Sequence, residues 1–240
     1  MRVGFPAIVV MLLIGVFAYW WFGGDEWAIV NQPPPPGAIV AFGDSLTAGT
    51  GAKPGRSYPE QLADLLRRPV INAGVPGDTI GEAAERLESD VLTHDPGLVL
   101  VLLGGNDLLQ RRDLDQSFAT FKRLIKRIQE DGAMVVLIGI KGFSPIARLG
   151  GRYRRLARQT GCLYIPAILD GILTERSLMA DQIHPNGQGY AIVARRIFEA
   201  IRPYLPERSP RSDRGNRAAG WDICLDILER IAETRYRGSL

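Results

Sequence analysis

The chain has 240 residues, of which 46% are hydrophobic and 23% are charged, the balance of an ordinary globular protein. Its formal net charge of +3 is small, and no pattern of interleaved basic and aromatic residues indicates nucleic-acid binding. The two cysteines, Cys162 and Cys224, fit neither a zinc site nor a disulfide scaffold. This length suits one well-buried domain with additional segments.

The first segment is an uncharged apolar run from Val3 to Phe22, which is long enough to cross a bilayer as a helix. Arg2 precedes the run, and Asp25 and Glu26 follow it, so the amino terminus is expected in the cytoplasm. A cleaved signal peptide and a buried core helix are the alternatives, but the run ends in bulky aromatic residues instead of a small-residue cleavage site. We therefore expect residues 1–24 to anchor a single-pass inner-membrane protein whose domain is periplasmic, or secreted if the run is cleaved.

Two segments of biased composition flank the middle of the chain. Residues 25–37 contain the prolines Pro33 to Pro36, which are typical of a stiff, extended linker. Residues 207–240 form a C-terminal tail that begins rich in Arg, Ser, Pro and Gly and is expected to be disordered there. Apolar residues from Trp221 to Ile231 then recur at helical spacing. This amphipathic helix docks on the domain, lies on a membrane surface or pairs with a protein partner, and the sequence leaves these alternatives open.

Residues 38–206 alternate short apolar strands with amphipathic helices. The expected strands are Ala38–Phe42, Val70–Asn72, Leu98–Leu103, Met134–Ile140 and Leu163–Ile165. The expected helices are Tyr58–Arg67, Thr79–Thr93, Leu114–Glu130, Ile146–Gln159 and Asn186–Leu205. The alternation predicts an α/β fold, a three-layer α/β/α sandwich around a mostly parallel, flavodoxin-like sheet of five strands.

Ligands of such sheets bind at the carboxyl ends of the strands. Three short polar or glycine-rich stretches follow the first three predicted strands, and a fourth precedes the last predicted helix. These stretches are Gly43–Leu46, Asn72–Thr79, Gly104–Asp107 and Asp181–Pro185. The sequence therefore predicts that one edge of the sheet carries the chemistry.

A serine hydroxyl is a weak nucleophile, and histidine suits the role of its base because its pKa lies near neutrality. Of the two histidines, His94 precedes the third predicted strand, away from the predicted site, and is interpreted as a surface residue. His184 follows Asp181 by three residues, a spacing at which one turn brings the carboxylate to the imidazole. This pattern predicts Ser45 as nucleophile, His184 as base and Asp181 as its orienting group. Each stretch alone also fits a helix cap.

A serine hydrolase also needs donors for the negative oxygen of its tetrahedral intermediate. The backbone N–H of Ser45 is one candidate. Gly77 is a second, because a residue without a side chain brings its N–H close to a ligand. Asn106 supplies a side-chain amide as the third. A tight turn at Gly77 and a helix cap at Asn106 are the structural alternatives.

Together and in this order, the four stretches resemble the sequence blocks of the SGNH (GDSL-type) hydrolase family. Ser45 matches the serine of block I, Gly77 the glycine of block II and Asn106 the asparagine of block III. Asp181 and His184 match the pair of block V. All five positions that the family uses in catalysis are therefore occupied by the matching residue types.

The resemblance extends from about Ile39 to Leu205 and leaves out both ends of the chain. The phrases Asn-Ala-Gly-Val-Pro-Gly-Asp-Thr and Leu-Gly-Gly-Asn-Asp are similar to the bacterial branch of arylesterase, acyl-CoA thioesterase I and lysophospholipase L1. This resemblance implies a three-layer α/β/α fold, a Ser-His-Asp triad and no metal or organic cofactor. Relatives of this branch are usually soluble periplasmic proteins, so the expected anchor is a departure from it.

We therefore expect a serine esterase that hydrolyses small acyl esters through an acyl intermediate on Ser45, with thioesters and lysophospholipids as related substrates. Two alternatives stay open on this scaffold. One is a carbohydrate or peptidoglycan O-acetylesterase, and the other is a non-catalytic, membrane-anchored binding module. The expected partners are a small acyl ester and, through residues 1–24, a membrane, but no nucleic acid.

Overall fold

The computed structural model describes residues 27–140 and 147–206, which hold the predicted domain except for residues 141–146. The predicted anchor at residues 1–24 and the tail at residues 207–240 lie outside the described residues. Within the described ranges, no helix is both long enough and apolar enough to cross a membrane.

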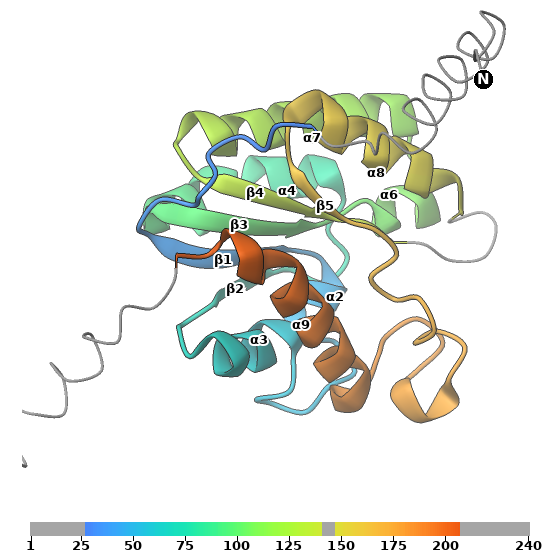
Figure 1. Ribbon diagram of the computed structural model, residues 1–240. Coiled ribbons are helices and arrows are strands. Elements are labelled where there is room, and N and C mark those ends of the chain that lie inside the picture. The colour runs from blue at the N-terminus through green and yellow to red at the C-terminus, as the bar shows by residue number, and fades with distance from the viewer. Residues whose placement is uncertain (1–26, 141–146, 207–240) are drawn as a thin grey trace, which may run out of the picture. The chain divides into compact units, whose positions relative to one another are not determined.

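Five strands form one parallel sheet at the centre of the domain (Figure 1). They are β1 (Ala38–Gly43), β2 (Ile71–Gly74), β3 (Pro96–Leu102), β4 (Met134–Ile138) and β5 (Leu163–Ile165). Their order across the sheet is β2-β1-β3-β4-β5, so the chain reverses direction across the sheet at β1 and β3. The carboxyl ends of β1 and β3 therefore meet at a switch point, where such sheets bind ligands.

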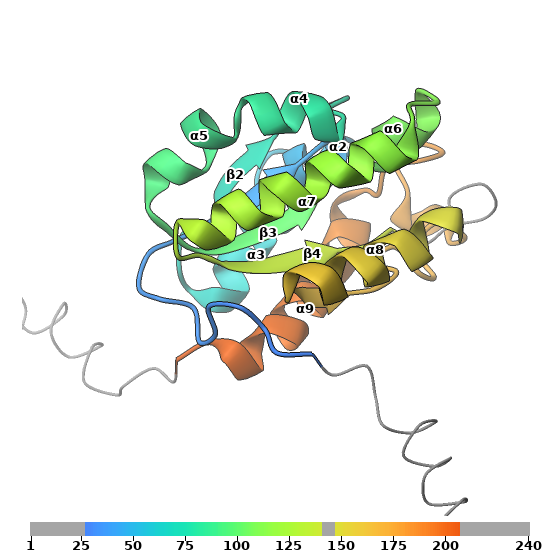
Figure 2. The ribbon, with the colours of Figure 1, turned by 90° about the horizontal axis from the view of Figure 1, so that it is seen from above.

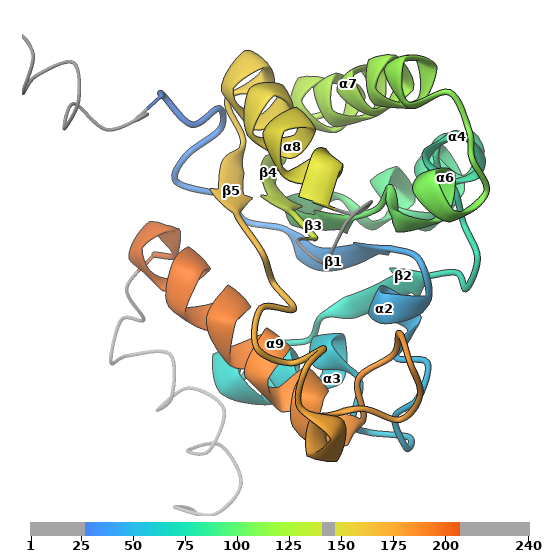
Figure 3. The same ribbon diagram turned by 90° about the vertical axis from the view of Figure 1, so that its right-hand side faces the viewer.

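Helices cover both faces of the sheet, as Figure 3 shows from the side. One face carries α4 (Ile80–Glu85), α5 (Leu87–Asp90), α7 (Leu114–Glu130) and α8 (Ala147–Thr160), seen from above in Figure 2. The opposite face carries α3 (Tyr58–Leu66) and α9 (Gly187–Ile201). Short helices α2 (Ser45–Ala48) and α6 (Gly105–Leu109) follow β1 and β3, and single 3-10 turns lie at Leu92–His94 (η1), Arg176–Leu178 (η2) and Arg202–Tyr204 (η3). The three-layer fold with five parallel strands is as predicted.

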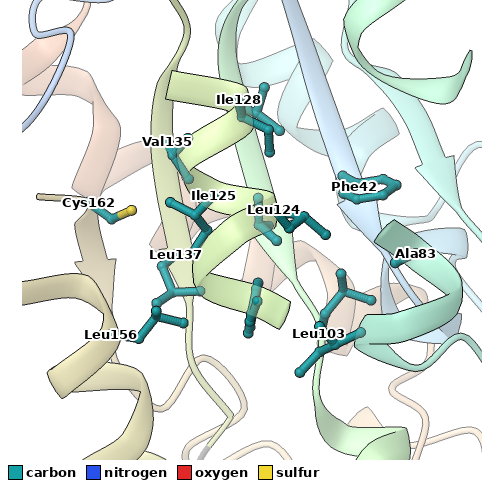
Figure 4. Close-up of a cluster of buried hydrophobic side chains, with 14 of the residues drawn as sticks. Phe42, Ala83, Leu103, Leu124, Ile125, Ile128, Val135, Leu137, Leu156 and Cys162 are labelled. Atoms are coloured by element: carbon teal, nitrogen blue, oxygen red, sulfur yellow. The ribbon is translucent and has the colours of Figure 1, made fainter. Parts of the chain in front are cut away.

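A cluster of buried hydrophobic side chains fills the core between the sheet and α7 (Figure 4). All seven residues of β3 and all five of β4 are buried, which explains why both read as continuous apolar runs in the sequence. Leu124, Ile125 and Ile128 on one side of α7 pack in this cluster with Val135 and Leu137 of β4. This packing fixes the rigid frame from which the loops at the carboxyl edge project.

Polar caps decide where the helices near that edge begin. Ser57 and Glu60 form a capping box at the start of α3, and Thr79 and Glu82 form another at the start of α4. The side chain of Asn186 accepts hydrogen bonds from two backbone N–H groups in the first turn of α9. These caps hold the loops immediately before the helices in one conformation.

The helix predicted over Thr79–Thr93 is wrong in one respect, because the structure divides it into α4, α5 and η1. The first break lies at Arg86, whose backbone is not helical (φ −103°, ψ 9°). The guanidinium of Arg86 donates to carbonyl groups at the ends of β1 and β2, beyond the helix. These tertiary contacts outweigh the local helical pattern, which carries no information about them.

Part of the segment predicted as a linker packs on the domain. The indole N–H of Trp27 donates to the carbonyl of Cys162 at 2.8 Å, and the N–H of Val30 donates to Gly161 at 2.9 Å. The side-chain amide of Asn31 donates to the carbonyls of Gln129 and Ala133 at 2.8 and 3.0 Å. The first described residues of the predicted linker are therefore attached to the turns before β4 and β5.

Candidate active site

Ser45 is the first residue of α2, directly after β1. The Asp44 carboxylate caps this helix by accepting a hydrogen bond from the N–H of Leu46 at 3.0 Å. This tight strand-to-helix turn leaves Ser45 partly exposed, whereas Asp44 is buried. The chain therefore presents the Ser45 hydroxyl at the carboxyl edge of the sheet.

The structure brings Ser45, His184 and Asp181 together, although His184 lies 139 positions from Ser45 in the chain. The Nε2 atom of His184 lies 3.0 Å from the Oγ of Ser45, and its Nδ1 atom lies 2.8 Å from the Oδ2 of Asp181. With the proton on Nδ1 donated to Asp181, Nε2 is the acceptor for the hydroxyl of Ser45. The three side chains form a continuous line of hydrogen bonds.

The environment of Asp181 keeps its carboxylate ionised. Its Oδ1 atom accepts from the backbone N–H groups of Ile183 and His184, each at 2.8 Å. The backbone hydrogen bond from Ile183 and the bonds from His184 lower the pKa of Asp181 to about 2. The Asp181 side chain is 52% exposed and that of His184 is 14% exposed, so solvent screens this pair more than a buried one.

Other contacts hold the loop that carries His184. Met179 and Pro185 form an isolated antiparallel bridge, and the carbonyl of His184 accepts from the N–H of Ala180 at 2.9 Å. Gly51, in the loop after α2, lies against this segment: a Cβ there would meet the Cβ of His184 at 3.2 Å. The other histidine, His94, is exposed at the opposite edge, as predicted.

The predicted oxyanion residues lie in two neighbouring loops. Gly77 has a φ of +91°, a conformation that favours glycine, in the turn after β2. The amide nitrogen of Asn106, in α6, donates to the carbonyl of Asp78 at 2.9 Å and lies 3.4 Å from Oδ2 of Asp44. Asn106 thus bridges the Gly77 turn and the residue before Ser45.

Sequence reasoning missed the carboxylates that build this edge. Asp107 is fully buried, and its Oδ2 atom accepts from the N–H of Ile80 at 2.9 Å, which ties α6 to the start of α4. Asp44 is also buried, and burial raises its pKa to about 6. Each carboxylate stands next to a predicted site residue in the chain, and this adjacency was the signal available. Only the tertiary structure shows their partners.

Other reactive groups lie away from this edge. Cys162 is buried, and burial raises the pKa of its thiol to about 12, so it is an inert core residue. Across residues 27–140 and 147–206, no three His, Cys, Asp or Glu side chains are grouped so that they could hold a metal ion. The absence of a cofactor stays a prediction.

Comparison with known proteins matches residues 41–192 to the GDSL-like Lipase/Acylhydrolase family. The chain is 28% identical to an arylesterase of Vibrio mimicus, over 70% of this chain and 89% of that protein. It is 27% identical to the thioesterase 1/protease 1/lysophospholipase L1 of Escherichia coli (strain K12), over 70% of this chain and 84% of that protein. A crystal structure of TesA superposes with a TM-score of 0.66 at 26% identity, over 70% of this chain and 99% of that chain.

Proposed function

Since the chain belongs to the GDSL-like lipase/acylhydrolase family and is a carboxylic ester hydrolase, we propose that it cleaves small acyl esters through an acyl intermediate on Ser45. The observation that carries the proposal is the hydrogen-bonded line from Asp181 through His184 to the hydroxyl of Ser45. Such a line activates a serine that is otherwise a weak nucleophile. Because the chain is an ester hydrolase, the alternative of a non-catalytic binding module no longer applies.

In the first half of the proposed reaction, Nε2 of His184 takes the proton of Ser45 while Oγ attacks the ester carbonyl carbon. The ionised Asp181 fixes the imidazole tautomer and stabilises the imidazolium that forms. His184 then donates the proton to the leaving alcohol or thiol. In the second half, water attacks the acyl–Ser45 ester with His184 again as base, which releases the acid and restores the serine.

The negative oxygen of each tetrahedral intermediate needs donors beside Ser45. We assign this role to the backbone N–H groups of Ser45 and Gly77 and to the side-chain amide of Asn106. The contact from Asn106 to Asp44 is long, at 3.4 Å, whereas its bond to the Asp78 carbonyl is 2.9 Å. The oxyanion therefore replaces Asp44 as the acceptor, and Asn106 stays attached to the turn.

The surface near these groups supports an apolar substrate. Three large apolar side chains are exposed close in the chain to the proposed catalytic and oxyanion residues: Val75 (39%), Leu109 (61%) and Ile183 (53%). An exposed apolar side chain beside a catalytic residue in the chain is a candidate contact for the apolar part of a ligand. We propose that they contact the acyl or aryl group, so that aryl esters, longer acyl esters and acyl thioesters are better substrates than acetylated glycans.

The Ser45→Ala variant tests the chemistry. We expect hydrolysis of p-nitrophenyl butyrate to fall by at least about 10³-fold, because the nucleophile is gone. Labelling by a fluorophosphonate probe is lost as well, whereas the circular dichroism spectrum is unchanged. The matched control is Ser89→Ala, at an exposed serine of α5, which keeps both activities. Full hydrolysis by Ser45→Ala contradicts the proposal.

A substrate series tests the apolar surface. Leu109→Ser and Ile183→Ser are each expected to lower kcat/KM for p-nitrophenyl octanoate by about 3–10-fold relative to p-nitrophenyl acetate, because apolar contact with the longer chain is lost. Leu65→Ser, at an exposed leucine of α3, is the control that leaves this ratio unchanged. A wild type that prefers acetylated xylo-oligosaccharides to all acyl and aryl esters identifies an O-acetylesterase instead.

A further inference from the structure

Arg86 has an unusual number of partners for a residue at a helix break. Its side chain is only 16% exposed, and its guanidinium makes four hydrogen bonds. The partners are Oδ2 of Asp78 at 2.6 Å, the carbonyl of Ala73 at 2.9 Å, the carbonyl of Gly43 at 3.0 Å and Oδ2 of Asp90 at 3.0 Å. One planar group therefore joins four points of the chain.

Three of these partners belong to the segments that meet at the proposed oxyanion turn. Gly43 ends β1, two positions before Ser45, and Ala73 lies in β2. Asp78 directly follows Gly77 in the turn after β2. The carbonyl of Gly43 also accepts from the N–H of Val75 at 3.0 Å, so the start of the turn is joined to β1 directly by this bond and indirectly through Arg86.

We propose that Arg86 is a positioning residue for the oxyanion donors, and this role rests on the proposed function. Its contact with Asp78 fixes the turn that carries Gly77. Its contact with Gly43 fixes the same turn relative to the strand that delivers Ser45. Because the carbonyl of Asp78 accepts from the amide of Asn106, the third donor is held by the same network.

The geometry requires a guanidinium. Nε, Nη1 and Nη2 point to different acceptors, and the plane lies over the ring of Phe42, with 4.5 Å from its central carbon to the ring centroid. A lysine ammonium places its three donors at a single point and does not stack in this way. Asp90 adds a second carboxylate at 3.0 Å, which fixes the other edge of the group. Replacement by lysine therefore keeps the charge but loses the bridge.

The Arg86→Lys variant tests this role with rates measured per active site, after titration with a fluorophosphonate. We expect kcat for p-nitrophenyl butyrate to fall about 10–100-fold, with a change in KM of less than about threefold, because misplaced donors act on the transition state. A trifluoromethyl ketone, which forms a hemiketal oxyanion on the serine, is expected to lose affinity by the same factor as kcat/KM. A purely structural role reduces the number of titratable sites and leaves these per-site values unchanged.

Two further variants sharpen the test. Asp78→Asn removes the carboxylate charge from the contact with Arg86 and tests the proposal independently if Arg86→Lys does not fold. When both fold, their combination is expected to lower kcat by little more than either alone, because both remove one interaction. Arg127→Lys is the control, since Arg127 also pairs with a carboxylate, Glu88, but on the exposed surface of α7.

The outcomes separate this role from the proposed function. Arg86→Lys and Asp78→Asn variants that keep the wild-type kcat and ketone affinity per site overturn the role of Arg86, while an active wild type and an inactive Ser45→Ala leave the proposed function intact. A wild type that hydrolyses no ester and labels with no phosphonate overturns the proposed function and this role together.

Discussion

Burial disturbs the ionisation of Asp44, the residue directly before Ser45. It is 3% exposed, and burial raises its pKa from 3.8 to about 6, against the lowering effects of the N–H of Leu46 and of the nearby His184. The folded protein therefore binds this proton more tightly than the unfolded chain does. Folding is penalised above pH 6, where Asp44 must be ionised in the interior, and the penalty disappears as the pH falls towards 4.

Because the raised pKa of Asp44 destabilises the fold at high pH, it leads to a prediction for the Asp44→Asn variant. Asparagine is also a good N-cap but carries no charge to bury, so the free energy of unfolding at pH 8 is expected to rise by roughly 2 kcal/mol. The gain disappears at pH 4, where Asp44 of the folded wild type is already protonated. The kcat for esters is expected to fall, because the negative charge of Asp44 that attracts the imidazolium of His184 during the reaction is lost. Stability and activity therefore change in opposite directions.

Urea denaturation at the two pH values measures the effect of Asp44→Asn. Asp113→Asn is the matched control, since Asp113 is likewise an aspartate N-cap, at the start of α7, but is exposed. If Asp44→Asn changes the free energy of unfolding equally at pH 8 and pH 4, or lowers it at pH 8, the conclusion that Asp44 carries a destabilising buried charge is contradicted.

At the scale of elements, the loop after α2 supports the loop of His184. Gly51 has a φ of +90°, and an added Cβ would lie 2.8 Å from the Cβ of Ala180 and 2.9 Å from the carbonyl of Pro185. The hydroxyl of Tyr190, which is buried in α9, donates to the carbonyl of Thr50 at 2.9 Å and thereby attaches this loop to α9. The position of His184 therefore depends on a close backbone approach that only glycine allows.

Gly51→Ala is expected to lower kcat about 10–100-fold, because a displaced His184 no longer reaches Ser45 at hydrogen-bonding distance. Gly55→Ala is the matched control in the same loop. Gly55 also has a positive φ, of +79°, but no atom lies within 4 Å of its added Cβ. Both variants lose about 1–2 kcal/mol of stability through backbone strain, and only Gly51→Ala loses activity. Equal activities measured per titrated site contradict this explanation.

The sequence predicted the bounds of a helix or strand correctly wherever one local pattern determines that element. The helix at Leu114–Glu130 and the strand at Leu163–Ile165 have the predicted bounds, since an amphipathic period or an apolar run with clear ends defines each. The helix break at Arg86 could not be predicted from the sequence, because it depends on carbonyl acceptors in β1 and β2 that lie close to Arg86 only in the folded protein. The same reason hid the attachment of Trp27 to the turn before β5.

The candidate site was predictable for a related reason. A parallel sheet brings the carboxyl ends of its strands to one edge, so residues from separate stretches of sequence had to meet there. Ser45 and His184 met as this rule requires. This rule predicts which residues lie at the edge but not which hydrogen bonds they form. The hydrogen-bond partners of Asn106 and Asp107 therefore could not be predicted from the sequence.

At the scale of the whole molecule, two truncations separate the predicted anchor from the domain. We propose that the apolar run at residues 3–22 holds the enzyme in a membrane, with its active edge outside the cytoplasm. Removal of residues 1–26 is then expected to move the protein from the alkali-resistant membrane fraction to the soluble fraction. The kcat for a water-soluble ester is expected to stay the same, because every residue of the proposed site is retained.

Removal of residues 1–32 is the informative comparison, since it also deletes the contacts of Trp27, Val30 and Asn31 with the domain. The partly buried indole and these hydrogen bonds together stabilise the fold by about 2–3 kcal/mol. The longer truncation is therefore expected to lower Tm by about 5–10 °C relative to the shorter one. Equal Tm values show that these contacts add nothing to stability. A full-length protein found in the soluble fraction contradicts the anchor, and neither result affects the chemistry assigned to Ser45.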